Sequence, residues 1–129
     1  VHISRYGQGG PMPAGTMMSA TFTLFGQEFY ALNGGPHFQF SPAGSFFIKC
    51  ADQAEVDYYW ERLTEGGVAQ PCGWLKDRYG LSWQVIPDRL GELLTDADPA
   101  RAHRAMAAMM GMHKLDIAAL EAAAEGAFL

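Results

Sequence analysis

Apolar and polar residues alternate along the first third of the chain, and this pattern predicts paired β-strands. The strand expected over residues 16–25 alternates apolar residues with serine and threonine through most of its length, the period of two that marks a half-buried strand. Residues 2–6 and 28–33 predict two further strands, and the glycine- and proline-rich residues 7–15 predict a loop. The chain is therefore expected to begin with a sheet.

A tight hairpin is expected to join two of these strands at Phe25-Gly26-Gln27-Glu28. Glycine at the first central position fits a type II′ turn, which requires a positive φ there. The apolar residues Phe22, Leu24, Phe29 and Ala31 then share one face of the hairpin. The register that follows pairs Phe25 with Glu28, Tyr30 with Thr23, and Leu32 with Thr21.

A strand and an amphipathic helix are expected in the middle of the chain. Residues 45–50 (SFFIKC) predict the strand. Asp52, followed by Glu55 three residues later, resembles a capping box and marks the helix start. Apolar residues then recur at i, i+3, i+4 and i+7, as on one face of a helix, before Gly66-Gly67 ends it. This apolar stripe consists of Val56, Tyr59, Trp60 and Leu63.

Two more strands, near residues 72–77 and 81–86, precede a helical last third. Asp98-Pro99 predicts a helix start, since proline suits the first helical position, and residues 116–124 predict a final, alanine-rich helix. Methionine is adaptable packing material, so we expect the stripe on the first of these helices to be buried against the domain or a partner subunit. This stripe consists of Ala102, Met106, Met109 and Met110.

The strands over 45–50 and 81–86 each present an apolar face that the amphipathic helix can cover. Their opposite faces, like that of the hairpin, carry serine, threonine, glutamine and aromatic residues. A sheet with one covered side and one mixed side is typical of a cupped ligand surface. A merely solvated sheet face explains the same pattern, and both interpretations stay open here.

Composition narrows the class of protein. The chain has 129 residues and 14.1 kDa, about one domain, and 49% of its residues are hydrophobic. A net charge of −5 argues against nucleic acid as a partner. No apolar run approaches the ~20 residues that span a bilayer, which argues against a membrane protein. Two cysteines, Cys50 and Cys72, are too few for a disulfide framework. We expect reduced thiols and a cytoplasmic protein.

The first residue is Val1 rather than methionine, and no signal peptide follows it. We therefore expect a processed, truncated or incompletely observed chain.

Several segments together resemble the PhnB-like branch of the vicinal oxygen chelate superfamily (glyoxalase, bleomycin-resistance and dioxygenase proteins), whose members often carry the name 3-demethylubiquinone methyltransferase. The resemblance implies an α+β fold of βαβββ modules plus C-terminal helices, with the first strand and helix absent from this chain. It implies a domain over 1–88, N-terminally incomplete, and a helical extension over 89–129 that packs on the domain or on a dimer partner. The segments are SRYGQGGPMPAG (4–15), GQEFYALNGGPHFQFS (26–41), CGWLKDRYGLSWQVIP (72–87) and RAHRAMAAMMGMHKLDIAALEAA (101–123).

The absence of the first strand and helix would expose a sheet edge and an apolar face. We expect a partner chain, or a segment outside this sequence, to cover them. A homodimer is the expected assembly, because domains of this superfamily commonly pair so that modules from two chains complete the cups.

The metal site of the superfamily is not expected here. The resemblance places ligands on four strands, one of which is missing from this chain. The second position falls on Tyr30 or Leu32, the third on Ser45, and the fourth, within DRYGLSWQV (77–85), on Gln84. A divalent metal prefers imidazole, carboxylate or thiolate to an amide or a hydroxyl. We therefore expect neither a metal nor another cofactor.

Histidines and glycine-rich segments offer little further chemistry. His37 follows Gly34-Gly35-Pro36 beside the expected cup and is the candidate residue to orient a ligand or to act as a base. A structural or solvated histidine is the interpretation that we favour for His37. Residues 7–11 precede no helix, so they predict no S-adenosylmethionine site.

The favoured hypothesis is a small-molecule binding protein with a metal-free concave pocket. The alternatives are an enzyme of the same superfamily (methyltransferase-labelled, glyoxalase-like or dioxygenase-like) that uses His37 or N-terminal residues outside this chain, and a structural dimer. The predicted pocket residues are Thr21, Thr23, Tyr30, Leu32, His37, Ser45, Phe47, Trp74 and Gln84.

Overall fold

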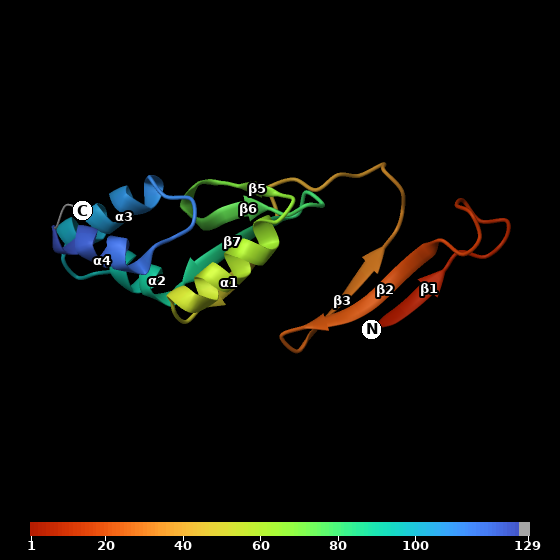
Figure 1. The fold of residues 1–129 in the computed structure, drawn as a ribbon, viewed down its shortest axis with the longest axis horizontal. Helices are drawn as coiled ribbons and strands as arrows, with labels where there is room; N and C mark the ends of the chain where they lie inside the picture. Colours follow the sequence, from red (N-terminus) through yellow and green to blue (C-terminus); the bar gives the residue numbers. More distant parts are fainter. Residues whose placement is uncertain (127–129) are drawn as a thin grey trace. The chain divides into compact units, whose positions relative to one another are not determined.

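The computed structural model describes residues 1–126. The chain forms two compact units, Val1–Gln39 and Phe40–Leu129, and the ribbon in Figure 1 shows the elements of each. The boundary between the units follows the first sheet. The family domain expected over 1–88 and the helical extension expected over 89–129 stay predictions.

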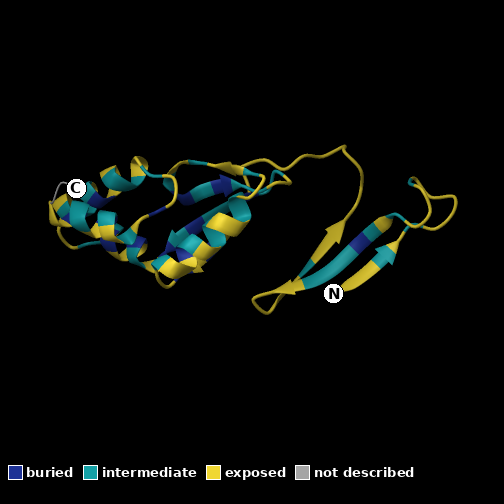
Figure 2. Cartoon of the chain, in the orientation of Figure 1, coloured by how far each residue is buried: buried dark blue, intermediate teal, exposed yellow. Residues whose placement is uncertain are grey.

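The first unit is a three-stranded antiparallel sheet. Its strands are β1 (His2–Arg5), β2 (Met17–Leu24) and β3 (Gln27–Leu32), in the order β1-β2-β3. All three were predicted from the alternating pattern. Ser19 is the one buried residue of this unit (Figure 2), and the unit contains no helix. The unit therefore has little core of its own.

The hairpin turn differs from the prediction by one residue. Phe25 and Gly26 are the central residues, with φ values of 52° and 76°, so the turn is of type I′ rather than II′. This register places Phe22 directly opposite Phe29, and their rings stack with centroids 5.7 Å apart. An aromatic pair contributes about 0.5–1.5 kcal/mol, which offsets part of the strain of a left-handed Phe25.

The register prediction is accordingly wrong, although the two faces of the hairpin were predicted correctly. Each partner moves by two positions, so every side chain keeps its face. Phe22, Phe29 and Ala31 therefore share a face, as expected. The observed pairs are Leu24 with Gln27, Thr21 with Tyr30, and Ser19 with Leu32.

The second unit contains a four-stranded sheet with α1 (Gln53–Thr64) on one face. The strands run in the order β4-β7-β6-β5, with β4 parallel to β7 and the other pairs antiparallel. The short β5, which is followed by a 3-10 turn over Pro71–Gly73, was not predicted. The strands are β4 (Phe46–Cys50), β5 (Val68–Ala69), β6 (Trp74–Lys76) and β7 (Ser82–Pro87).

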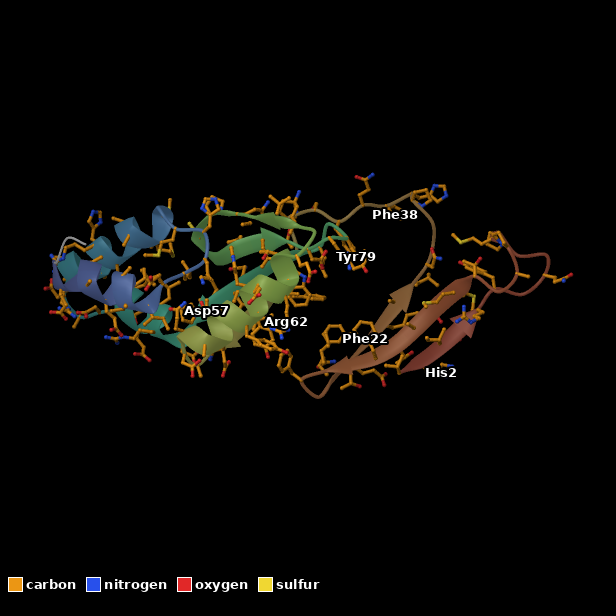
Figure 3. All side chains as sticks on the ribbon, in the orientation of Figure 1. His2, Phe22, Phe38, Asp57, Arg62 and Tyr79 are labelled. Carbon is orange, nitrogen blue, oxygen red and sulfur yellow. The ribbon has the colours of Figure 1, made fainter. Side chains whose placement is uncertain are left out.

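Helix α1 begins and packs as its sequence predicts. The Asp52 carboxylate accepts a hydrogen bond of 2.9 Å from the backbone N–H of Glu55. The predicted stripe faces the sheet. Its Val56 is part of a buried core, and its other three residues pack against that core, whose remaining members are Ile48, Cys50, Leu75 and Val85. On its outer side Asp57, labelled in Figure 3, contacts the Lys114 ammonium at 2.9 Å. This ion pair joins α1 to the segment before the last helix.

Asp77 organises the turn between β6 and β7. Its carboxylate accepts hydrogen bonds from the backbone N–H of Tyr79 at 2.8 Å and of Leu81 at 3.0 Å, and from the Trp83 indole at 2.9 Å. Tyr79 lies at the tip of this turn (Figure 3). One side chain thus fixes the relative positions of two strands that carry predicted pocket residues.

Three helices complete the second unit: α2 (Asp88–Leu94), α3 (Pro99–Met110) and α4 (Ile117–Glu125). The last two were predicted, whereas α2 was not. They enclose a second core of Leu90, Leu93, Ala105, Leu115, Leu120 and Ala124. No helix within residues 1–126 combines the length and the apolar character that a membrane crossing requires.

The methionine stripe of α3 is only partly buried within this chain. Met109 packs against the second core, but Met106 is 42% exposed and Met110 is 64% exposed. Ala105 is the residue of α3 that is fully buried, because its small side chain lets α3 and α4 approach closely. Met106 and Met110 are therefore not buried against the domain, and their burial against a partner subunit stays a prediction.

Candidate functional site

The sheet face opposite α1 gathers four of the predicted pocket residues. Gln84 on β7 lies directly between Phe47 on β4 and Trp74 on β6, with which it pairs across the sheet. Directly paired residues project to the same side of a sheet. The Gln84 side-chain amide donates a hydrogen bond of 3.0 Å to the Ser45 hydroxyl. The strand alternation therefore brings these four residues together, as predicted.

A cavity of about 340 Å³ lies over this face. The sheet supplies one wall, and α2 and α3 supply the other. None of the residues that line the cavity is charged. Among them, Gln84 has a side-chain amide that can form hydrogen bonds. The lining residues are Phe47, Cys72, Trp74, Gln84, Ile86, Leu90, Gly91, Leu94 and Met109.

The helical wall of this cavity was missed by the sequence reasoning. Leu90 and Leu94 stand four residues apart, a spacing that indicates one helix face, but Gly91 beside Leu90 weakens the helical signal. Cys72 was expected inside a strand and instead adopts a left-handed conformation with φ 64°. No local pattern indicates that α3 would bring Met109 to this place.

The remaining predicted pocket residues belong to the first unit. Thr21 pairs with Tyr30 across β2 and β3, and Thr23 and Leu32 lie on the same face. Tyr30 and Leu32 are 67% and 65% exposed, and His37 is exposed in the segment after β3. A single pocket formed by both groups of residues stays a prediction.

The residues present do not fit the divalent metal that the resemblance implies. At two of the expected ligand positions the donors are a hydroxyl and an amide, hydrogen-bonded to each other through Ser45 and Gln84. Such donors bind transition metals far more weakly than imidazole or carboxylate. Within residues 1–126, moreover, no three histidine, cysteine or acidic side chains gather in a way that suits a metal ion.

A larger cavity, of about 590 Å³, lies where α1, α2 and α4 begin. Its charged groups are already engaged within the protein. Arg89 pairs with Glu92 at 2.9 Å and with Glu121 at 3.0 Å, while Asp52 and Asp116 cap α1 and α4. We therefore regard this cavity as a junction between helices rather than as a ligand site.

The two cysteines lie in different environments, and both are free thiols. Cys50 is fully buried beneath α1. Burial, and to a smaller degree the nearby Glu55 carboxylate, raises the pKa of its thiol to about 11. Cys72 is partly exposed at the cavity wall.

We expect iodoacetamide to alkylate Cys72 in the native protein and to leave Cys50 unmodified. The thiolate is the nucleophile, and Cys50 is both inaccessible and held protonated. Peptide mass spectrometry after a short exposure measures the two sites separately, with urea-unfolded protein as the control in which both react. Comparable labelling of Cys50 in the native protein contradicts the buried environment.

Within residues 1–126, two sheets and four helices define a mixed α+β protein with an uncharged, aromatic-walled cavity. Residues 1–86 match the model of the family described as 3-demethylubiquinone-9 3-methyltransferase. The chain belongs to this family, the PhnB-like proteins, and this membership supports a vicinal oxygen chelate-type fold.

The solved structures that are similar to this chain include the following two. A PhnB protein from Bacillus cereus, which carries a provisional 3-demethylubiquinone-9 3-methyltransferase name, is 37% identical with a TM-score of 0.60, over 67% of this chain and 77% of its own. Protein PA1353 from Pseudomonas aeruginosa is 21% identical with a TM-score of 0.48, over 62% of this chain and 73% of its own. No curated protein matches the chain.

Proposed function

We propose that this chain is a small-molecule binding protein of the vicinal oxygen chelate superfamily, with a concave pocket that works without a metal. The observation that carries the proposal is the cavity of about 340 Å³ over Phe47, Trp74 and Gln84, whose lining is uncharged. Ligand pockets are typically apolar and contain a few placed polar groups. This cavity has that composition.

The lining favours a flat, uncharged ligand with one hydrogen-bond donor. The aromatic rings of Phe47 and Trp74 stand on either side of Gln84 along the sheet and offer faces for stacking. Gln84 uses its amide N–H₂ on Ser45, which fixes the side chain and leaves its carbonyl oxygen as the acceptor. A hydroxyl group on an aromatic ligand suits that oxygen.

The module arrangement and the assembly belong to the same proposal. The order β4-α1-β5-β6-β7, with β4 beside β7 in the sheet, supports a βαβββ module. The first unit has three strands and no helix. This supports the expectation that a partner chain, or a segment outside this sequence, covers its sheet. We expect a homodimer in the cytoplasm, and we expect that it binds neither nucleic acid nor a membrane. The remaining predicted pocket residues are expected to complete a pocket in this dimer; they are Thr21, Thr23, Tyr30, Leu32 and His37.

The second candidate is an enzyme of the same superfamily, which the methyltransferase description of the family favours. Its base would be His37 or a residue outside this chain. His37 is exposed in the segment after β3. This candidate requires turnover, whereas the binding protein requires only saturable binding.

Isothermal titration with 2-naphthol, an uncharged two-ring phenol, tests the proposal. We expect saturable binding to metal-free protein, weakened about 5- to 10-fold by Gln84→Leu, because one hydrogen bond contributes about 1–1.5 kcal/mol. Gly91→Ala narrows the cavity without a clash, since its Cβ finds open space, and it too weakens binding. The matched control is Gln27→Leu, an exposed glutamine on β3.

Equal binding by the Gln84 and Gln27 variants contradicts the assignment of the cavity. Binding that appears only after Zn²⁺ or Mn²⁺ is added contradicts the metal-free pocket. Turnover of a ligand that is lost in His37→Ala supports the enzyme instead.

A further inference from the structure

One buried hydroxyl on the cavity side of the sheet has no hydrogen-bond partner. Ser82 on β7 is fully buried, and within residues 1–126 its Oγ is the one buried side-chain oxygen or nitrogen that lacks a partner. Ser82 lies two residues before Gln84 on the strand, so the two side chains project to the same side of the sheet. A buried hydroxyl without a partner is unfavourable, and a ligand atom that accepts its hydrogen bond relieves this cost.

A lysine lies directly across the sheet from this hydroxyl. Lys76 on β6 pairs with Ser82 on β7, just as Trp74 pairs with Gln84. Directly paired residues project to the same side of a sheet, so Lys76 continues the cavity face beyond Trp74. Lys76 is half-buried, and in the part of the chain that the structure describes no carboxylate forms an ion pair with it. Its charge is therefore available to a ligand.

The carboxylate that follows Lys76 in the chain is engaged elsewhere. Asp77 accepts hydrogen bonds from two backbone N–H groups of its own turn and from the Trp83 indole. Trp83 packs against the core beneath α1, on the other side of the sheet. Lys76 and Ser82 are thus left as donors on the cavity side.

Ser45 adds a second hydroxyl at the same end of the sheet face. It accepts the hydrogen bond of 3.0 Å from the Gln84 amide, which leaves its own O–H available as a donor. Ser45 precedes Phe46, which pairs with Trp83 in the parallel register of β4 and β7, so Ser45 lies beside Ser82. An ammonium group and two hydroxyl groups therefore gather next to the cavity.

We propose that Lys76 and Ser82 bind a carboxylate of the ligand, attached to the aromatic rings that the cavity holds. A carboxylate accepts several hydrogen bonds, and those from charged donors are the strong ones. Alternate residues of a strand lie about 6.6 Å apart, so the carboxylate lies about one such step beyond Gln84. The flexible stem of Lys76 moves toward the carboxylate and gives it access to the Ser82 hydroxyl.

This inference rests on the proposed function and narrows its ligand to the class of aromatic acids. The aromatic rings stay in the uncharged cavity over Phe47 and Trp74, and only the acidic group extends past Gln84. Lys76 and Ser82 thereby become residues that determine specificity, because they select an acid over an uncharged compound of the same shape.

Isothermal titration of the full chain with 2-naphthylacetate and with its uncharged amide, 2-naphthylacetamide, tests this acid site. We expect the acid to bind about 10-fold more tightly than the amide, because its bonds are charge-assisted, and Lys76→Met to abolish this preference. The matched control is Lys49→Met, which removes an exposed lysine on the same side of the sheet and leaves the preference unchanged.

Ser82→Ala provides a second, independent variant. We expect it to weaken binding of the acid about 5-fold, since one hydrogen bond to a charged group is lost. The same variant should be at least as stable as wild type in urea unfolding, because Ser82 has no partner within residues 1–126 to lose.

Equal affinity of the wild-type protein for the acid and the amide overturns the inference, and this comparison does not depend on the folding of any variant. A preference for the acid that survives in Lys76→Met, or that is lost equally in Lys49→Met, overturns it as well. Binding of 2-naphthol without any preference for the acid leaves the proposed function intact. Failure of all three compounds to bind contradicts the proposed function itself.

Discussion

Leu75→Ala is expected to lower the free energy of unfolding by about 3 kcal/mol, because removing a buried leucine side chain loses its burial and leaves a cavity. Leu75 on β6 is fully buried. It packs in the core between the sheet and α1 with Val56 and Val85. A β-strand within a four-stranded sheet has little freedom to collapse into the space that is created.

Urea unfolding followed by tryptophan fluorescence measures this effect in one unit alone. All three tryptophans, Trp60, Trp74 and Trp83, belong to the unit Phe40–Leu129. The control is Met106→Ala on α3, where the side chain is 42% exposed and the change should stay within about 0.5 kcal/mol. A loss below about 1 kcal/mol for Leu75→Ala contradicts the core described above.

Local signals in the sequence were sufficient for the main elements of the fold. Helix α1 has a capping aspartate, a four-residue apolar stripe and terminal glycines, and each acts as its chemistry predicts. The alternation in β2, β4 and β7 assigns side chains to faces correctly. These features depend on neighbours within a few residues, which a sequence displays directly.

Features decided by competing small energies were not predictable in the same way. The hairpin turn lies one residue earlier than predicted, in a register that stacks Phe22 on Phe29. Cys72 adopts a left-handed backbone because hydrogen bonds from its turn reach the segment after α3. Both outcomes depend on partners that local patterns do not reveal.

One wall of the candidate site was predictable from local sequence patterns, and the other was not. Phe47, Trp74 and Gln84 were predicted together because neighbouring strands with alternating faces bring them together whatever else the chain does. The opposite wall, with Leu90 and Met109, depends on how helices pack over the sheet. No periodicity within a helix states which surface it will cover.

Gly67→Ala is expected to destabilise the second unit by about 3 kcal/mol, because overpacking against backbone forces main-chain shifts. Gly67 follows α1, and its N–H donates a 2.8 Å hydrogen bond to the Thr64 carbonyl. A Cβ at this position would lie 2.1 Å from the Lys76 carbonyl oxygen and 2.9 Å from the Asp77 carbonyl carbon. These are backbone atoms that cannot swing away as a side chain would.

The strain from Gly67→Ala should be relieved where Val68 pairs with Lys76, so the β5–β6 pairing opens first. Hydrogen exchange at the amides of this pair, with the same fluorescence-detected unfolding, measures both the local and the global effect. Gly44→Ala is the matched control, since its Cβ meets open space before β4. Equal stability of the two variants would mean that the end of α1 and β6 lie farther apart than described. It would also contradict the position of the cavity, because Trp74 on β6 lines it.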